Sequence, residues 1–513
     1  MGIRFRRFCF FMAEQDKNKP NYRCRDYCAM ALDWEIVEDL SAGIRELRSK
    51  GAKYLPVEPA EDVVKDYPIR LSRALLFNVF ERTLNGLVGM VFRKEPKLGP
   101  DVPEIIRGRE AVESQSKVEG WAENIDMQGS AWTVFLKEVF TDAMRLGYAF
   151  IYVDMPPKLS QGARRADELA TGRRPYWVGY TAKQALNWRS AMETRVVTLS
   201  NGESILVPTG RRILQQITFE ERSYEPDGLY GEKEVKRYRV LTPGGWELYR
   251  EVKNDKGQTD YPLEASGESS LSEIPVAVIY GRKTGDLTSK PPLLDLASIN
   301  IGHYQKYSDY SEGLRMCIPQ LCAKGVDADH KFEVIGHHTF HTVRPDGDIW
   351  FAEPTGAGLE PQRKDLFDLE AQMARLGLAI MAPNAPRPEK TATEVFANHV
   401  ETDSDLATAA RSLKDGGERA LMFTVQYEDS KAQSGGSIEG LEIDQLTLTE
   451  AEMNAYSGMQ AAGQLSLETF LAILARAGRL LENTDPKTEA QKAIKEAQAR
   501  QPQPAKASAA GRP

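Results

Sequence analysis

Apolar residues at helical spacing predict three helices in the first part of the chain. The first helix is expected from Asn21 to Lys50, and the second begins near Asp66 and ends before Pro96. The third is expected from Ser130 to Leu146. In the first helix the apolar positions recur every three or four residues, at Ala29, Leu32, Ile36, Leu40, Ile44 and Leu47. This spacing places them on one face, which predicts packing against a core.

The pattern then changes to one that favours strands. The apolar run YAFIYVDMP, which begins at Tyr148, predicts a strand buried on both faces. The polar segment ARRADELATGRRP is expected to be a mobile excursion, and PYWVGYTAKQALNWR to form a strand followed by a short helix. From Thr194 to Arg282, short apolar segments separated by turns such as SNGE and TPGG predict a β-rich subdomain. Asn254 to Ser272 is expected to be a flexible loop within it.

Two long helices that bracket a short β module are predicted next. Pro292 to Met316 forms the first, Ile318 to Glu353 the β module, and Arg363 to Met381 the second helix. In the second helix, steps of three and four residues predict a contact stripe formed by Leu366, Leu369, Met373, Leu376 and Ile380.

A proline-rich loop is expected to separate the second of these helices from a third long one. The prolines between Ala382 and Lys390 prevent a helix until Thr391 or Thr393 caps the next, so this loop should be stiff and protruding. The following helix is expected from Thr393 to Glu428, and the paired glycines Gly416 and Gly417 predict a kink in it.

The C-terminal part predicts a strand, two helices and a disordered tail. The strand is expected at IEGLEID, and the helices at Thr449 to Gly463 and Leu467 to Ala477. From Asn483 the chain is rich in Lys, Gln, Ala and Pro with almost no large apolar side chain, so we expect disorder there.

Composition favours a large soluble protein of two to four structural regions with no membrane span. The chain has 513 residues, of which 41% are apolar and 27% charged, and no apolar run is long enough to cross a bilayer. The start MGIRFRRFCFFM faintly resembles a signal peptide, but its apolar part is too short, and Met12 is the expected true start. Five cysteines without a regular framework fit a reducing cytoplasm.

The sequence predicts no enzyme, no cofactor and no metal. It lacks a phosphate loop, a G-x-S-x-G elbow and an H-E-x-x-H pair. One histidine cluster occurs, at His337, His338 and His341, for which a surface or subunit-interface role is favoured over metal binding. The net charge of −8 argues against tight nucleic-acid binding, but a channel past which DNA slides should lack strong phosphate clamps.

From pattern alone, two interpretations have equal weight. Long helices with contact stripes and no catalytic cluster are typical of subunits that assemble into a ring or bundle. An ordinary large helical core would produce the same pattern.

Five segments together resemble a family of tailed-bacteriophage portal proteins, the head-to-tail connectors, over roughly residues 20–480 and in the same order. They are Arg73 to Leu98, Arg174 to Arg189, Pro291 to Tyr310, Lys390 to Leu413 and Gly463 to Leu480. No single segment is a catalytic signature, so the resemblance rests on the ordered set.

The resemblance implies an α+β portal fold with a mainly helical stem, wing and crown and β-rich wing and clip subdomains. In this sequence it implies an N-terminal extension at 1–20, expected to be disordered, a wing at 21–290 whose β-rich part spans 194–282, a first stem helix at 291–317, a clip at 318–360, a second stem helix at 361–381, a tunnel loop at 382–392, a long kinked helix at 393–428, a C-terminal wing and crown at 429–482 and a disordered tail at 483–513.

The same resemblance implies a homo-oligomeric ring, usually of twelve subunits, at the capsid vertex of the virion, assembled in the host cytoplasm. Its expected partners are the large terminase subunit, head-completion or adaptor proteins, the major capsid or scaffold protein, and double-stranded DNA that passes through without sequence specificity. The histidine cluster would lie in the clip interface. The DNA-facing residues of the tunnel loop would be Pro383, Asn384, Pro386, Arg387, Pro388 and Lys390.

Two other functions remain open at this point. Another head–tail joining component of the virion would share the architecture, and negative-stain microscopy would distinguish it by the absence of rings. A packaging nuclease or ATPase would need a phosphate loop or a carboxylate metal cluster, and neither pattern occurs in the sequence.

Overall fold

The computed structural model describes residues 16–59, 61–109, 119–156, 172–198, 204–254, 257–317, 320–324, 333–335, 338–340, 346–352, 356–381, 405–441, 450–461, 465–476 and 485–500. The chain divides into two compact units, Met1–Leu441 and Glu442–Pro513. The described residues combine helices with antiparallel sheets, which confirms the expected α+β class. Residues 1–15 of the expected N-terminal extension lie outside the described residues, and so does most of the segment ARRADELATGRRP.

The N-terminal helices are shorter than the sequence pattern predicts. One helix was expected over 21–50, but the structure has α2 (Arg25–Ser41) and α3 (Ile44–Lys50), because Gly43 adopts a φ of +84° between them. The helix expected from Asp66 is likewise two helices, α4 (Asp66–Arg73) and α5 (Val79–Val91). Asn78 begins α5 by accepting a hydrogen bond from the Glu81 amide at 3.1 Å.

Short elements connect these helices to the central sheet. They are the 3-10 turns η2 (Gly51–Lys53) and η3 (Trp121–Asn124), the strand β1 (Lys97–Leu98) and the helix α6 (Glu104–Arg107).

A three-stranded antiparallel sheet forms the centre of the first unit. Its order is β11 (Val276–Tyr280), β2 (Tyr148–Asp154) and β3 (Tyr176–Thr181), and every residue of β2 is buried, as the continuous apolar run predicts. Helix α7 (Trp132–Leu146), close to its expected bounds, packs on this sheet. Helix α12 (Asp405–Gln426) lies on the same face, since both helices contact the side chain of Trp177.

A five-stranded antiparallel sheet covers the opposite face. The stacked rings of Tyr180 and Phe219, with centroids 4.1 Å apart, join the two sheets. Its order is β10 (Leu263–Glu268), β7 (Gly245–Arg250), β6 (Gly231–Thr242), β5 (Ser204–Asp227) and β4 (Ala185–Thr198). Smaller pairs are β8 (Val252–Lys253) with β9 (Thr259–Asp260) and β12 (Lys283–Gly285) with β13 (Thr288–Ser289).

The β-rich subdomain is confirmed with three corrections. The segment Asn254 to Ser272, expected to be a flexible loop, contains β9 and β10. The pattern does not predict these strands, because a polar strand at a sheet edge lacks the apolar alternation by which strands are recognised. The short helix expected after β3 is one turn, η4 (Ala182–Gln184), before β4 begins. Strand β11, expected within this subdomain, pairs with β2 instead.

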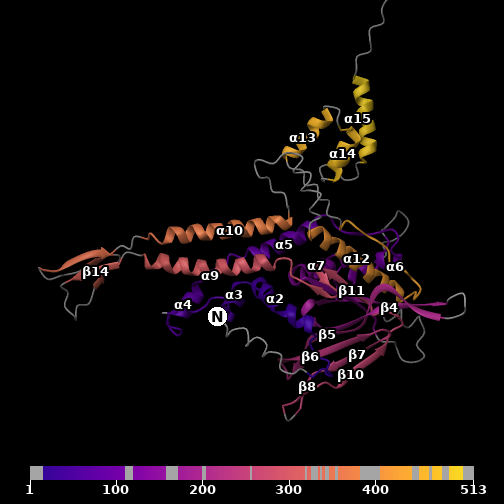
Figure 1. Cartoon of the computed structure of the whole chain (residues 1–513), viewed down its shortest axis with the longest axis horizontal. Helices are drawn as coiled ribbons and strands as arrows, with labels where there is room; N and C mark the ends of the chain where they lie inside the picture. Colours follow the sequence, from indigo (N-terminus) through magenta and orange to yellow (C-terminus); the bar gives the residue numbers. More distant parts are fainter. Residues whose placement is uncertain are drawn as a thin grey trace, which may run out of the picture. The chain divides into compact units, whose positions relative to one another are not determined.

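Two long helices and a β insertion follow, as predicted (Figure 1). Helix α9 (Leu294–Met316) and helix α10 (Leu359–Met381) lie side by side and antiparallel, with the insertion at their far end. The insertion contains β14 (Gln320–Lys324), β15 (Glu333–Ile335), β16 (His338–Phe340) and β17 (Asp348–Ala352). Strand β18 (Ile438–Glu439), shorter than the predicted IEGLEID, pairs with β1.

The paired glycines of α12 allow close packing. The helix runs through Gly416 and Gly417 without interruption, and both residues are buried. A Cβ atom on Gly416 would lie 2.6 Å from Cγ1 of Ile279, and one on Gly417 would lie 2.7 Å from Cδ1 of Ile438. Glycine therefore lets α12 approach β11 and β18. The pair was expected to kink the helix, and this packing role was not predicted.

The second unit contains three described helices, α13 (Glu450–Ala461), α14 (Leu467–Arg476) and α15 (Pro486–Arg500). The first two confirm the expected pair. The tail expected to be disordered from Asn483 is helical over α15, because Asp485 accepts a hydrogen bond from the Thr488 amide at 3.1 Å and Ala490 is buried. Its Ala, Gln, Lys and Glu residues are good helix formers.

Candidate functional site

The candidate site is the hairpin formed by α9 and α10 together with its β insertion. Each helix has 23 residues. The predicted contact stripe on α10 is confirmed where its side chains are described, with Leu366 and Met373 buried and Leu369 and Leu376 half-buried. The fifth member of the stripe, Ile380, lies in α10, but its side chain is outside the described part.

Polar and close contacts also hold the two helices together. Nζ of Lys306 lies 2.6 Å from a carboxylate oxygen of Asp365, which forms an exposed ion pair between the helices. Nearer the insertion, a Cβ atom on Gly313 would lie 2.9 Å from Cδ2 of Leu359. The glycine therefore permits a close approach of the two helices at that end.

The N-terminal half of α9 is anchored in the core of the first unit. Asn300 is fully buried, and its side-chain oxygen accepts a hydrogen bond from the Phe80 amide at 3.1 Å while its nitrogen donates to the Phe77 carbonyl at 2.8 Å. Nε2 of the buried His303 lies 3.3 Å from Oε1 of Glu370 on α10. Nε2 of Gln305 donates to the Tyr54 carbonyl at 2.8 Å. These contacts fix the base of the hairpin.

A buried arginine adds a second anchor. Nε and Nη2 of Arg70 on α4 each lie 2.8 Å from an oxygen of Glu61, and Nη2 also donates to the Pro56 carbonyl at 2.6 Å. Asp309 of α9 lies 3.8 Å from Nη1 of Arg70. Paired with Arg70, the Glu61 carboxyl has a pKa below its usual range. Burial raises the pKa of Asp309, and Glu58 adds to this effect.

The half of the hairpin nearer the insertion is exposed. Beyond Ser308, no residue of α9 is buried. Leu314 is 45% and Met316 71% exposed near the insertion. Phe367 of α10 is 57% exposed and lies farther along the hairpin, between the residues of α10 that pair with Lys306 and His303. Trp350 of the insertion is also exposed. Large apolar side chains that are exposed on one hairpin are candidates for a surface that another protein covers.

The β insertion is built from two short antiparallel ribbons. In one, Gln320 to Lys324 pair with Ala352 to Asp348, and in the other, Ile335 pairs with His338. Of the predicted interface histidines, only the backbone of His338 is described, while His337 and His341 lie outside the described residues. All six residues predicted to face DNA in the tunnel loop, from Pro383 to Lys390, also lie outside them.

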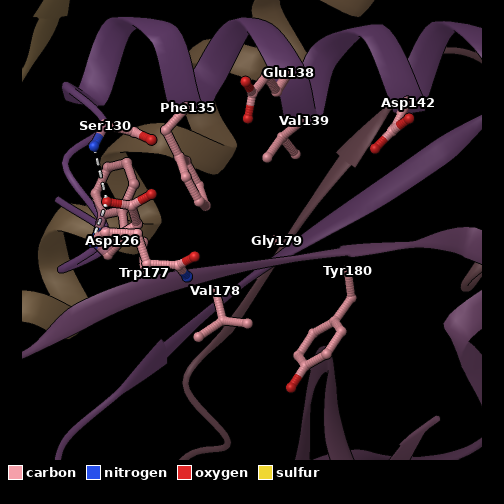
Figure 2. A pocket seen from close by; sticks show the side chains of 11 residues that line it. Asp126, Ser130, Phe135, Glu138, Val139, Asp142, Trp177, Val178, Gly179 and Tyr180 are labelled. Carbon is pink, nitrogen blue, oxygen red and sulfur yellow. Dashed lines mark hydrogen bonds between the residues drawn. The ribbon is translucent and has the colours of Figure 1, made fainter. Parts of the chain in front are cut away.

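A separate pocket of about 430 Å³ lies between α7 and β3 (Figure 2). Asp126, Glu138 and Asp142 contribute carboxylates to its lining, and Phe135 and Val139 point from α7 toward the strand. No motif in the sequence signals this pocket, because the pocket depends on how α7 and β3 pack.

Two of the three carboxylates of this pocket, Asp126 and Asp142, have partners of their own. Oδ1 of Asp126 accepts hydrogen bonds from the amides of Gln128 at 2.8 Å and Ser130 at 3.0 Å. Burial opposes ionisation of Asp126, but these hydrogen bonds outweigh it and lower the pKa of the carboxyl. Burial raises the pKa of Asp142, which pairs with Arg145. Among the described residues, no group of three or more His, Cys, Asp or Glu side chains is arranged to hold a metal ion.

Of the described helices, none has the length and apolar composition that crossing a bilayer needs.

Comparison with known proteins gives one family match. Residues 292–428 match a family described as a domain of unknown function, DUF4055. The matched region contains α9, the β insertion, α10 and α12, so it coincides with the candidate site and the helix that follows it. No curated protein matches the chain.

Proposed function

We propose that this protein is the portal subunit of a tailed bacteriophage or prophage, which assembles into a ring around a DNA channel at the capsid vertex. The observation that carries the proposal is the α9–α10 hairpin, anchored at its base by Asn300 and exposing apolar side chains toward the β insertion. The ordered resemblance of five segments to portal proteins supports it independently.

The exposed apolar side chains of the hairpin support assembly into a ring. A ring forms when one face of a subunit binds a different face of its neighbour and the rotation closes. The two helices of the hairpin carry exposed apolar side chains, Leu314 and Met316 on α9 and Phe367 on α10. Neighbouring hairpins can bury these side chains against one another. A bundle of hairpins around an axis would leave a central passage.

The proposal assigns roles to the parts of the first unit and no catalytic activity. The hairpin is the stem and the β insertion is the clip, which would bind the large terminase subunit and the head-completion or adaptor proteins. The rest of the first unit is the wing, where the capsid or scaffold protein would bind. The subunit would reside in the virion after assembly in the host cytoplasm, and double-stranded DNA would pass without sequence-specific contacts.

Electron microscopy of the purified protein tests the ring. We expect particles with a central hole, and Phe367→Asp should abolish them while the subunit stays folded, because a substitution of an exposed residue changes stability little. The matched control is Leu229→Asp, which charges an exposed leucine on the β5–β6 turn and should leave the rings intact. Monomers of the unmodified protein, or equal loss of rings in both variants, would contradict the proposal.

A second experiment tests the channel. Shortening the loop from Ala382 to Lys390 should reduce DNA packaging more than ring formation, because this loop is expected to project toward DNA. Packaging would be measured as DNA protected from nuclease in assembled heads. Normal packaging with a shortened loop would remove the role assigned to Arg387 and Lys390.

A further inference from the structure

We propose that the groove between β3 and α7 binds a short extended peptide of a partner protein that carries lysine or arginine. The peptide would form backbone hydrogen bonds with Gly179 at the outer edge of β3 and place its cationic side chain beside Glu138. The groove belongs to a single subunit, so this proposal does not depend on the ring.

The edge of β3 is open at one residue. Strand β3 is the outermost strand of its sheet and pairs only with β2. On its outer side, the Trp177 amide donates to the Ile125 carbonyl at 3.0 Å, and the Thr181 amide donates to Oε1 of Gln184 at 2.8 Å. Because backbone groups alternate along a strand, Gly179 directs its N–H and C=O to this same side. Gly179 is exposed, and no described group pairs with it there.

The walls of the groove surround the open position at Gly179. The turn from Asp126 to Ser130 closes one end and α7 forms one side (Figure 2). Phe135 and Val139 provide an apolar wall. A Cβ atom on Gly179 would lie 3.3 Å from Cγ2 of Val139, so the glycine lets α7 pack closely over the strand at this position. Pairing of an extended peptide with an exposed sheet edge is a common mode of peptide recognition.

The charge of the groove determines which peptide fits. Asp126, Glu138 and Asp142 line it. Of the cations nearby, Arg145 pairs with Asp142 and Arg174 donates to the Asn124 carbonyl. Glu138 is exposed and forms no ion pair with a described residue. A lysine or arginine of the peptide can therefore pair with Glu138, whereas the carboxylates would repel an acidic peptide or a phosphate backbone.

Binding of a synthetic peptide to the full-length protein tests the proposal. The probe is a fluorescein-labelled hexapeptide of sequence TVKVKT, followed by fluorescence anisotropy. We expect saturable binding with a Kd of about 1 mM or tighter. Hydrogen exchange followed by mass spectrometry should show slower exchange in the fragment that contains Gly179 when the peptide is bound, because its amide becomes hydrogen-bonded.

Altered peptides and one protein variant separate backbone pairing with Gly179 from simple charge attraction. N-methylation of the backbone at the central residues should weaken binding about tenfold or more, since it removes the pairing N–H groups. The peptide TVEVET should not bind. Glu138→Gln should weaken binding about two- to fivefold, as expected for one exposed ion pair, and Glu232→Gln, an equally exposed change on β6, should have no effect.

The proposal is overturned if TVKVKT does not bind, if its N-methylated form binds equally well, or if exchange near Gly179 is unchanged in the complex. Equal affinity of the Glu138→Gln and unmodified proteins would show that Glu138 does not select a cationic peptide. None of these results bears on ring formation, which the microscopy tests separately.

Discussion

The side-chain oxygen of Asn300 accepts a hydrogen bond from the Phe80 amide across 220 residues of sequence. The same side chain donates to the Phe77 carbonyl, so one residue of α9 satisfies two backbone groups that flank the start of α5. Asn300 is fully buried, and water cannot replace these bonds without opening the core. Asn300 therefore fixes where α9 meets the rest of the first unit.

Asn300→Leu should lower the free energy of unfolding by about 2 to 4 kcal/mol. Leucine has the same number and branching of side-chain heavy atoms but leaves the Phe80 amide and the Phe77 carbonyl buried without partners. Urea unfolding at fixed subunit concentration would measure the change. Ser298→Ala, an exposed change on the same helix, should alter stability by less than about 0.5 kcal/mol. Equal effects of the two changes would refute the anchoring role.

Arg70→Met should destabilise the protein by about 3 to 5 kcal/mol, because the Glu61 carboxylate is almost buried and would lose the cation that pairs with it. Glu61→Gln should cost less, since the glutamine oxygen still accepts a hydrogen bond from Arg70. Thermal unfolding of the two variants at neutral pH would rank them. The reverse order would show that the buried pair is not what the arginine contributes.

The same pair predicts a pH dependence. Hydrogen bonding to Arg70 lowers the pKa of Glu61 in the folded protein below its ordinary value of 4.5. The stabilisation is therefore fully present above about pH 4.5 and is lost as the pH falls through the lower folded pKa. Between pH 7 and pH 3, the unmodified protein should lose more stability than Glu61→Gln. Parallel losses in the two proteins would contradict this sign.

Gly416→Ala should destabilise the protein by about 1 to 3 kcal/mol although alanine is the better helix former, because its Cβ would lie 2.6 Å from Ile279. The matched control is Gly89→Ala on α5, where no atom lies within 4 Å of the new Cβ. That change should stabilise by about 0.5 to 1 kcal/mol. Urea unfolding distinguishes them by sign, and a stabilising Gly416→Ala would revive the kink as the reason for the glycine pair.

A hydrogen bond between β3 and α12 predicts energetic coupling. Nε1 of Trp177 donates to Oγ1 of Thr424 at 2.9 Å, and both side chains are buried. Trp177→Phe and Thr424→Val should each cost about 1 to 3 kcal/mol, and the double variant should cost less than their sum by about 1 kcal/mol. A double-mutant cycle in urea measures this coupling. Strict additivity would show that the bond contributes nothing.

Local pattern predicted much of the fold. The stripe on α10 was readable because helix packing repeats every three or four residues, and Leu366 and Met373 are buried as that period requires. The strand β2 was readable because its residues from Tyr148 to Val153 form a continuous run of apolar and aromatic side chains. Polar edge strands and the helix of the tail were not, since β10 has no apolar alternation and α15 has few large side chains to bury.

The candidate site was only partly readable for a related reason. The hairpin follows from local periodicity, whereas its anchors join residues far apart in sequence, such as Arg70 with Asp309. The groove at Gly179 requires the register of β3 against β2 and the placement of α7, neither of which a single sequence specifies. The expected DNA-facing loop and the interface histidines stay predictions.

The hairpin is fixed at one end and exposed at the other, which makes it a cantilever. At 1.5 Å per residue, α9 rises about 24 Å from Asn300 to Met316. A sideways force on the β insertion therefore acts through this arm, first on the Arg70–Asp309 contact and then on the hydrogen bonds of Asn300. A protein that binds the insertion would therefore load the contacts that hold α9 in the core of the subunit, away from the point of contact.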